Sequence, residues 1–224
     1  MSIVIPIDGP TSSGKSSVGH LFAKDISFQY VDSGAIYRAG AVEMRDQNID
    51  SANKDAVIKI FSELQLRFED RDAHLHTYLH ERDITEVLHN PEITAIVPVI
   101  AAYPEVRLEV IKVQRRICES IDTVMAGRDI GTECFPEARL KFYLTADIQI
   151  RAQRRLSQLK EKVQGITYDE VLEQMIERDK ADMIRKNSPL RIPADAVIID
   201  TTTRTTEETV EVMLDHFKRV YGTK

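Results

Sequence analysis

The sequence predicts an α/β protein, a doubly wound five-stranded parallel sheet with helices on both faces, built around a phosphate-binding loop. Three observations support this fold class. An apolar run at residues 3–7 leads into a glycine-rich loop, and that loop opens a helical pattern. Short β-branched runs then alternate with helical stretches along the chain. Such alternation implies right-handed crossovers, which make the sheet parallel and place helices on its two faces.

The glycine-rich stretch is GPTSSGKS, Gly9 to Ser16, and it fits the pattern G-x-x-x-x-G-K-[ST]. In this pattern backbone N–H groups cradle phosphates, the lysine meets the β and γ charges, and the hydroxyl holds Mg²⁺. The competing interpretation is an ordinary Gly/Ser turn with an exposed lysine. The preceding strand and the following helix favour the phosphate loop, since a helix N-terminus offers free N–H groups. The predicted donor-phosphate residues are Gly9, Pro10, Thr11, Ser12, Ser13, Gly14, Lys15, Ser16 and Ser17, with Ser16 as the Mg²⁺ ligand.

Composition limits the class of protein. With 224 residues and 42% hydrophobic content, the chain can bury one full core and is long enough to include an inserted subdomain. The net charge of -6 disfavours binding to nucleic acid or to an anionic membrane, because both need a broad basic surface. Cys118 and Cys134 show no metal-ligand spacing and suggest a reduced chain without disulfides. The opening apolar run is too short to direct export, so we expect a cytoplasmic protein.

Further strands are predicted at Phe28–Val31, Thr123–Ala126, Leu140–Leu144 and Ala196–Ile199. Polar residues follow the first two of these, at Asp32–Arg38 and at Gly127–Gly131. Open α/β sheets bind their ligands beyond the carboxyl ends of the strands. Arg38 is therefore a candidate for an anionic group, which its planar fork can bind bidentately.

Between Leu66 and Thr85 apolar and polar residues alternate, which predicts an antiparallel hairpin or a three-stranded piece with a turn at 71–73. Four histidines lie in or near this segment: His74, His76, His80 and His89. They complete no four-ligand metal pattern, so a solvated strand face is favoured over a metal site.

Residues 91–121 are helical in pattern but contain Pro98 and Pro104, and Pro104 is placed to start a helix. Arg107 would lie near that helix's N-terminus, where the dipole disfavours a cation. Because the helix gives no reason for an arginine at this position, a functional role for Arg107 is favoured. The last helix is predicted from a possible capping box of Thr205 and Glu208, an apolar stripe, and Gly222 at its end.

Arginines are concentrated between the fourth and fifth predicted strands. Arg151, Arg154 and Arg155 fall within little more than one turn, where like charges repel without evident compensation. A phosphate bound among them would remove that repulsion. Arg178, Asp182 and Arg185 follow at helical spacing, and a salt-bridged helix surface is a serious alternative for them.

The distribution suits phosphoryl transfer between nucleotides. Such a reaction brings two highly charged phosphates together and is catalysed mainly by positioning and charge neutralisation. The sequence contains no Ser-His-Asp arrangement, no H-E-x-x-H and no paired cysteines. It does contain arginines at nearly every loop predicted at the sheet's ligand edge.

Over nearly its whole length, from Ile3 to about Tyr221, the chain resembles the bacterial cytidylate kinase family of nucleoside monophosphate kinases. The marks are IDGPTSSGKS, DSGAIYR at 32–38, GRDIGT at 127–132, ERD followed by Asp182 and Arg185, and PADAVIID at 193–200. The resemblance implies a single kinase domain, 1–224, with a monophosphate-binding insertion at 36–120 and a short arginine-rich lid region at 148–190. It implies ATP with Mg²⁺ as donor and CMP or dCMP as acceptor. We expect a monomer whose partners are small-molecule nucleotides, not nucleic acid or membrane.

Carried onto matching positions, the resemblance implies the following roles. Catalytic residues would be Lys15, Arg128, Arg151 and Arg155, with Arg154 among the ATP-binding residues. CMP-binding residues would be Ser33, Arg38, Arg107, Arg128, Asp129, Arg178, Asp182 and Arg185, with Arg107 and Asp129 at the cytosine edge.

The chain departs from the family pattern at two positions. Pro98 stands where a serine usually contacts the pyrimidine, and His89 stands where an arginine is usual. Proline supplies neither hydroxyl nor N–H, so the local helix must bend or start there and one hydrogen bond to the base is lost. We therefore predict a weaker preference for CMP over UMP or dCMP than in the family.

Two other functions are alternatives for this sequence. The nearer one is another small-molecule kinase with a phosphate loop, acting on UMP or AMP. The other is a nucleotide-binding switch, which requires a guanine-reading N-K-x-D. The nearest string, Asn53-Lys54-Asp55-Ala56, lacks the final aspartate and precedes a helix.

Overall fold

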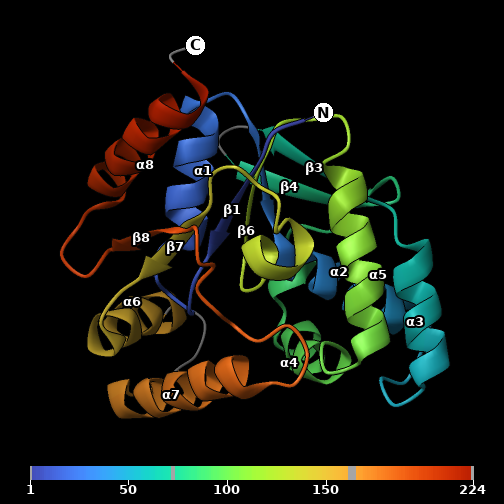
Figure 1. The fold of residues 1–224 in the computed structure, drawn as a ribbon. Helices are drawn as coiled ribbons and strands as arrows, with labels where there is room; N and C mark the ends of the chain where they lie inside the picture. The colour runs from blue at the N-terminus through green and yellow to red at the C-terminus, as the bar shows by residue number, and fades with distance from the viewer. Residues whose placement is uncertain (1, 72–73, 161–164, 223–224) are drawn as a thin grey trace. The chain divides into compact units, whose positions relative to one another are not determined.

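The computed structural model describes residues 2–71, 74–160 and 165–222. Its main sheet has five strands in the order β2-β6-β1-β7-β8, and β1 pairs in parallel with β7, as β7 does with β8 (Figure 1). The strands are β1 Val4–Asp8, β2 Gln29–Asp32, β6 Thr123–Gly127, β7 Phe142–Thr145 and β8 Val197–Asp200. The predicted α/β class with a five-stranded sheet is confirmed. β7 begins two residues later than predicted, where Ile7 of β1 lies opposite Phe142.

The helices connect these strands, as the crossover rule requires. They are α1 Lys15–Asp25, α2 Ser33–Asp46, α3 Lys54–Glu63, α4 Pro91–Ile100, α5 Pro104–Ile117, α6 Ile148–Lys160, α7 Tyr168–Ile184 and α8 Thr206–Tyr221. None of the helices in the described part is long and apolar enough to cross a bilayer. The two cysteines are buried and free, in agreement with the prediction of no disulfide.

The chain divides into two compact units, one of Met1–Val4 and Ser27–Met125, the other of Ile5–Ile26 and Ala126–Lys224. The first unit contains a second sheet, with β3 Leu66–Arg71 antiparallel to β4 His74–Leu79 and a short β5 Arg82–Asp83 (Figure 1). This confirms the predicted three-stranded piece. Two residues of its predicted turn, 72–73, lie outside the described residues.

Apolar faces of α2 and α3 form much of the first unit's core. Ile36, Val57 and Phe61 are fully buried there. The Phe61 ring lies so close to Gly40 of α2 that a side chain at that position would collide with it. The apolar face of α3, with Val57 and Phe61, therefore serves packing.

Pro98 lies inside α4, which continues to Ile100, and its ring is exposed. The prediction that a helix could start at Pro98 is therefore wrong. The helix begins at Pro91 instead, because a proline suits the first turn, where its missing N–H would have no intrahelical partner. α5 begins at Pro104 for the same reason, as predicted.

The second unit is built on β1, β7, β8 and the helices around them. Phe22 of α1 meets Phe142 of β7 and Phe217 of α8 edge to face, with ring centroids 5.7 and 6.2 Å apart. α6 and α7 pack through a smaller core of Ala152, Val171 and Met175. The capping box of Thr205 and Glu208 is present at the start of α8, and Gly222 ends that helix.

Candidate functional site

The phosphate loop, residues 9–16, joins the end of β1 to the start of α1 in the second unit. Gly9 has φ 149°, and a Cβ there would lie 2.1 Å from the carbonyl oxygen of Leu144. Gly14 adopts the left-handed conformation as the N-cap of α1. Only glycine tolerates the first position, and it is the easiest residue at the second. The backbone conformations at Gly9 and Gly14 thus explain why the motif has glycine at both positions.

Lys15 and Ser16 lie at the start of α1, where the helix N–H groups are free to receive an anion. Lys15 is buried, and its Nζ donates to the carbonyl of Pro10 at 2.7 Å, which folds the side chain back over the loop. Ser16 is exposed, so its hydroxyl is accessible for a metal or a phosphate. Within the described residues, no group of three or more His, Cys, Asp or Glu side chains is arranged to hold a metal by itself.

Arg128 links the phosphate loop to α7. It follows β6 directly, and its Nη2 donates to the Thr11 hydroxyl at 2.8 Å. Its Nε donates to Asp182 at 3.1 Å. The sequence placed Arg128 at the acceptor phosphate and Thr11 at the donor phosphate, and the structure brings these two side chains into direct contact.

Arg185 and Asp129 complete this group of charges. Arg185 lies 3.6 Å from the carboxylate of Asp129 and 3.4 Å from that of Asp182. Arg178, in contrast, is exposed on α7. Four of the predicted acceptor residues, Arg128, Asp129, Asp182 and Arg185, are therefore joined in one network beside the phosphate loop.

Arg151 is buried, in contrast to an arginine on a solvated helix face. Its Nη1 forms an ion pair with Asp179 of α7 at 2.7 Å and donates to the Thr11 carbonyl at 3.2 Å. Its Nε donates to the carbonyl of Ala146 at 2.9 Å. The expectation that the arginine cluster lacks compensation is wrong for Arg151, because Asp179 neutralises it from another helix.

Arg154 and Arg155 have separate surroundings. Arg154 donates to the carbonyl and the hydroxyl of Thr201, at 2.6 and 3.0 Å. The same hydroxyl donates to the carbonyl of Ser13 in the phosphate loop at 3.0 Å. Burial lowers the pKa of Arg155. Whether the 148–190 region closes as a lid stays a prediction, and residues 161–164 of it lie outside the described part.

Ser33 and Arg38 lie in the first unit, at the start of α2. Asp32 caps this helix by accepting from the N–H of Gly34 at 3.0 Å, and its second oxygen accepts from Arg38 at 2.7 Å. Ser33 is buried. The sequence analysis missed the helix at 33–46 and the role of Asp32, although an aspartate just before a helix is a common cap.

Arg107 is also in the first unit and is buried. Its Nε donates to the carbonyl of Ala101 at 2.9 Å, at the C-terminal cap of α4, and its guanidinium lies 5.9 Å from the centre of the Tyr37 ring. The expectation that Arg107 lacks a helix-based reason is wrong. The reason comes from the end of the neighbouring α4, where cations are favoured, and a contact with a ligand stays a prediction.

Asp8 is a residue that the sequence analysis missed. It closes β1, its side chain is 0% exposed, and its two oxygens accept from the N–H groups of Ile130 and Gly131 at 2.9 and 2.7 Å. Burial raises the pKa of Asp8 to about 6, and the nearby charge of Asp129 adds to this effect. A charged residue at the end of an otherwise apolar strand was the available signal.

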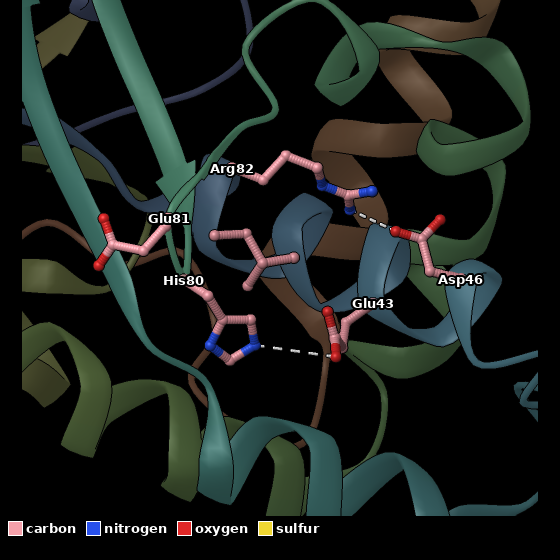
Figure 2. A pocket seen from close by; sticks show the side chains of 6 residues that line it. Glu43, Asp46, His80, Glu81 and Arg82 are labelled. Atoms are coloured by element: carbon pink, nitrogen blue, oxygen red, sulfur yellow. Dashed lines mark hydrogen bonds and ion pairs between the residues drawn. The ribbon is translucent and has the colours of Figure 1, made fainter.

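A hollow in the first unit has a different character (Figure 2). Figure 2 shows the His80 ring directed at Glu43 and Arg82 directed at Asp46, pairs that the ion-pair geometry confirms. The described lining residues are Glu43, Asp46, Leu79, His80, Glu81 and Arg82, which include none of the predicted site residues. Three carboxylates make this hollow unsuited to a nucleotide phosphate.

The chain is similar to known kinases over nearly its whole length. The family model described as cytidylate kinase matches residues 5–219. Cytidylate kinase of Caldanaerobacter subterraneus subsp. tengcongensis is 38% identical over 98% of this chain and 96% of its own length. That of Bordetella bronchiseptica is 39% identical over 96% of this chain and 95% of its own.

Solved structures support the fold. Shikimate kinase from Bacteroides thetaiotaomicron has a TM-score of 0.50 and 13% identity, covering 99% of each chain. Shikimate kinase from Acinetobacter baumannii, in complex with shikimate, has a TM-score of 0.50 and 14% identity, covering 100% of this chain and 97% of its own. At such identities the likeness concerns the fold alone. The match of the family model and the identity to curated relatives show that this chain belongs to the cytidylate kinase family.

Proposed function

We propose that the protein transfers the γ-phosphoryl group of ATP to CMP or dCMP and so forms ADP and CDP or dCDP. The observation that carries the proposal is the direct contact between Arg128 and Thr11. It joins an arginine that follows β6 to the phosphate loop, and this supports a site in which a cationic group would lie between the donor and the acceptor phosphate. Family membership supports the choice of the cytidine nucleotides.

The donor half of the site is the phosphate loop. Its N–H groups, at the start of α1, would hold the β-phosphate, and Lys15 would swing from the Pro10 carbonyl to the β and γ oxygens. The exposed hydroxyl of Ser16 would hold Mg²⁺, which neutralises charge on the transferring phosphoryl group when bound. The hydroxyl is an oxygen donor and fits that hard cation.

The acceptor half of the site needs cations more than a base. The attacking atom is a phosphate oxygen that is already anionic, so catalysis requires positioning and charge neutralisation. Arg128 would bind the acceptor phosphate, and Arg185 with Asp182 would hold the sugar side of the nucleotide. Ser33, Arg38, Arg107, Asp129 and Arg178 stay proposed acceptor contacts, and Arg154 and Arg155 stay proposed donor or transition-state contacts.

Arg151 acts on the loop in this proposal. The hydrogen bond from Arg151 to the Thr11 carbonyl supports the backbone of the phosphate loop, and the ion pair with Asp179 neutralises the charge of Arg151. A direct catalytic contact of Arg151 would require the ion pair with Asp179 to open, and such an opening is a costly step for a buried pair.

The test is a screen of acceptors for ADP release, with ATP and Mg²⁺ and with CMP, dCMP, UMP, AMP and GMP in turn. We expect turnover with CMP and dCMP above the others. Lys15→Ala should lower kcat by at least about 100-fold, because the lysine contributes to the charge of the transition state. Lys24→Ala is the matched control, since Lys24 is an exposed lysine in the last turn of the same helix.

The screen separates the alternatives. Turnover that is fastest with UMP or AMP would assign another nucleoside monophosphate kinase. Binding of ATP without turnover of any monophosphate would overturn the kinase proposal. Circular dichroism of Lys15→Ala must match the parent protein, so that lost activity is not lost folding.

A further inference from the structure

The carboxylate of Asp8 links the phosphate loop to the segment that follows β6, and the proposed reaction requires both to keep a fixed relative position. Asp8 is directly followed by Gly9, the first residue of the phosphate loop. Its oxygens receive the N–H groups of Ile130 and Gly131, which directly follow Arg128 and Asp129. One buried side chain thus ties the base of the donor loop to the helical turn η2, the π-helix Ile130–Cys134, which directly follows two proposed acceptor residues.

The chemistry of the contact requires a carboxylate. Two consecutive N–H groups converge on one side chain, and each is met by its own oxygen, at 2.9 and 2.7 Å. Asparagine has one acceptor oxygen and one donor amide, so it can satisfy only one of the two N–H groups. Serine or threonine has only one side-chain oxygen, on a shorter side chain, so it cannot meet both N–H groups. An apolar side chain would leave both N–H groups buried without a partner.

The fold accepts an unfavourable residue to make this contact. Complete burial disfavours the charge of Asp8 and raises its pKa, and the neighbouring charge of Asp129 adds to this effect. The N–H groups of Gly131 and Ile130, and to a smaller extent the charge of Lys15, act in the opposite direction but offset burial only in part. Tyr143, whose pKa is raised by burial and by Asp179 and Asp8, also faces this region. Lys141 borders Gly131 but is paired with Asp195.

We propose that Asp8 is a positioning residue, which holds the Ile130–Gly131 backbone and thereby places Arg128 and Asp129 for the acceptor nucleotide. This inference rests on the proposed function. Asp8 touches neither nucleotide in it and acts only through the turn. The turn is well suited to this control, because Arg128 reaches Thr11 and Asp182 from a backbone that Asp8 anchors two residues further on.

The test compares Asp8→Asn with the parent protein by steady-state kinetics and by calorimetric binding of each nucleotide. We expect KM for CMP to rise about 10-fold, the effect of one lost buried hydrogen bond at the turn. The dissociation constant of ATP should stay within about twofold, because the phosphate loop keeps its own contacts. Asp25→Asn, an exposed aspartate at the end of α1, is the matched control and should change neither value.

A second variant disturbs the same contact from the other side. A methyl group on Gly131 would lie 3.2 Å from an Asp8 oxygen and equally close to side-chain carbons of Lys141 and Pro193, so Gly131→Ala should shift this backbone while Asp8 itself stays intact. We expect the same pattern, with weaker CMP binding and unchanged ATP binding. This variant decides the matter if Asp8→Asn does not fold.

Three outcomes bear on the proposal. A loss confined to CMP in either variant supports positioning. Equal losses for CMP and ATP, or unchanged CMP binding in folded variants, would overturn it and leave Asp8 with a structural role. If the parent protein phosphorylates another monophosphate, the same comparison is made with that acceptor, so the proposed function and this inference fail separately.

Discussion

The buried ion pair between Arg151 and Asp179 allows a quantitative test of how the phosphate loop is supported. The two side chains are only 8% and 11% exposed, and their charged atoms are 2.7 Å apart. We consider three variants, Asp179→Leu, Arg151→Met and the two together. Each single variant leaves one charge buried without its partner, whereas the double variant leaves none.

The contacts of each partner set the magnitude. Arg151 keeps the carbonyls of Ala146 and Thr11 when Asp179 is removed, so part of its polar surface stays satisfied. Within the described residues, the other oxygen of Asp179 has no hydrogen-bond partner, so this carboxylate depends on Arg151. Breaking a buried pair typically costs about 3–5 kcal/mol, whereas replacing both partners by apolar residues is often nearly neutral. Removing Arg151 should therefore cost the most, about 4 kcal/mol.

Urea unfolding at pH 7 measures these free energies, and thermal unfolding gives a second reading. For a chain of this size about 4 kcal/mol corresponds to a fall in Tm of roughly 12 °C. The double variant should lose less than Arg151→Met alone, since it removes the unpaired charge. Both variants lacking Arg151 should raise KM for ATP, because the Thr11 carbonyl loses a donor.

The controls are Gln153→Ala on α6 and Glu173→Gln on α7, both exposed positions. The reasoning is refuted if either single variant costs less than about 1 kcal/mol. It is also refuted if the cost of the double variant equals the sum of the two single costs, because independent residues behave in that way.

Three further predictions concern stability and specificity. Because the pKa of Asp8 is raised from 3.8 to about 6, the stability that this group contributes is full below about pH 4 and is lost as the pH rises through 6. Relative to Asp8→Asn, the parent's unfolding free energy in urea should fall by about 2–3 kcal/mol between about pH 4 and pH 7, and a constant difference would contradict this. Gly40→Ala should destabilise by about 1–3 kcal/mol in thermal unfolding despite better helix propensity, because its Cβ would lie 2.2 Å from the buried Phe61 ring; an unchanged or higher Tm would show that the ring moves freely. Pro98→Ser restores a hydroxyl that can hydrogen-bond to the base, and its N–H can donate to the Thr94 carbonyl within α4. It should raise the ratio of kcat/KM for CMP to that for UMP several-fold, and an unchanged ratio would end the idea that Pro98 relaxes specificity.

Local signals predicted much of the fold because they need few residues to act. The phosphate loop is defined by two glycines, a lysine and a hydroxyl within eight positions, and its strand and helix lie directly beside it. The cap at Thr205 and Glu208 depends on residues three apart. Pro98 shows the limit of such signals, since a proline near a helix end can be accommodated there instead of starting a new helix.

The arginines could not be placed in the same way. Arg107 is held by the end of α4 and by Tyr37, while Arg151 is held by Asp179 and by the phosphate loop. The residues that neutralise or stack on them are between 6 and 140 positions away in the chain. The clustering of charges singled out Arg151, and a place near a helix N-terminus singled out Arg107, but neither signal showed what the arginine contacts.

The sequence by itself determined the α/β class, the phosphate loop and the family, because each depends on short-range spacing or on matches along the whole chain. Only the tertiary structure decided which charges are paired. Asp8 illustrates the physical reason, since its partners at 130 and 131 are 122 and 123 residues away and become neighbours only when β1 and the turn after β6 are brought together. The local sequence shows only a charged residue at the end of an apolar strand. The burial of Asp8, its raised pKa and its two N–H partners arise from that packing.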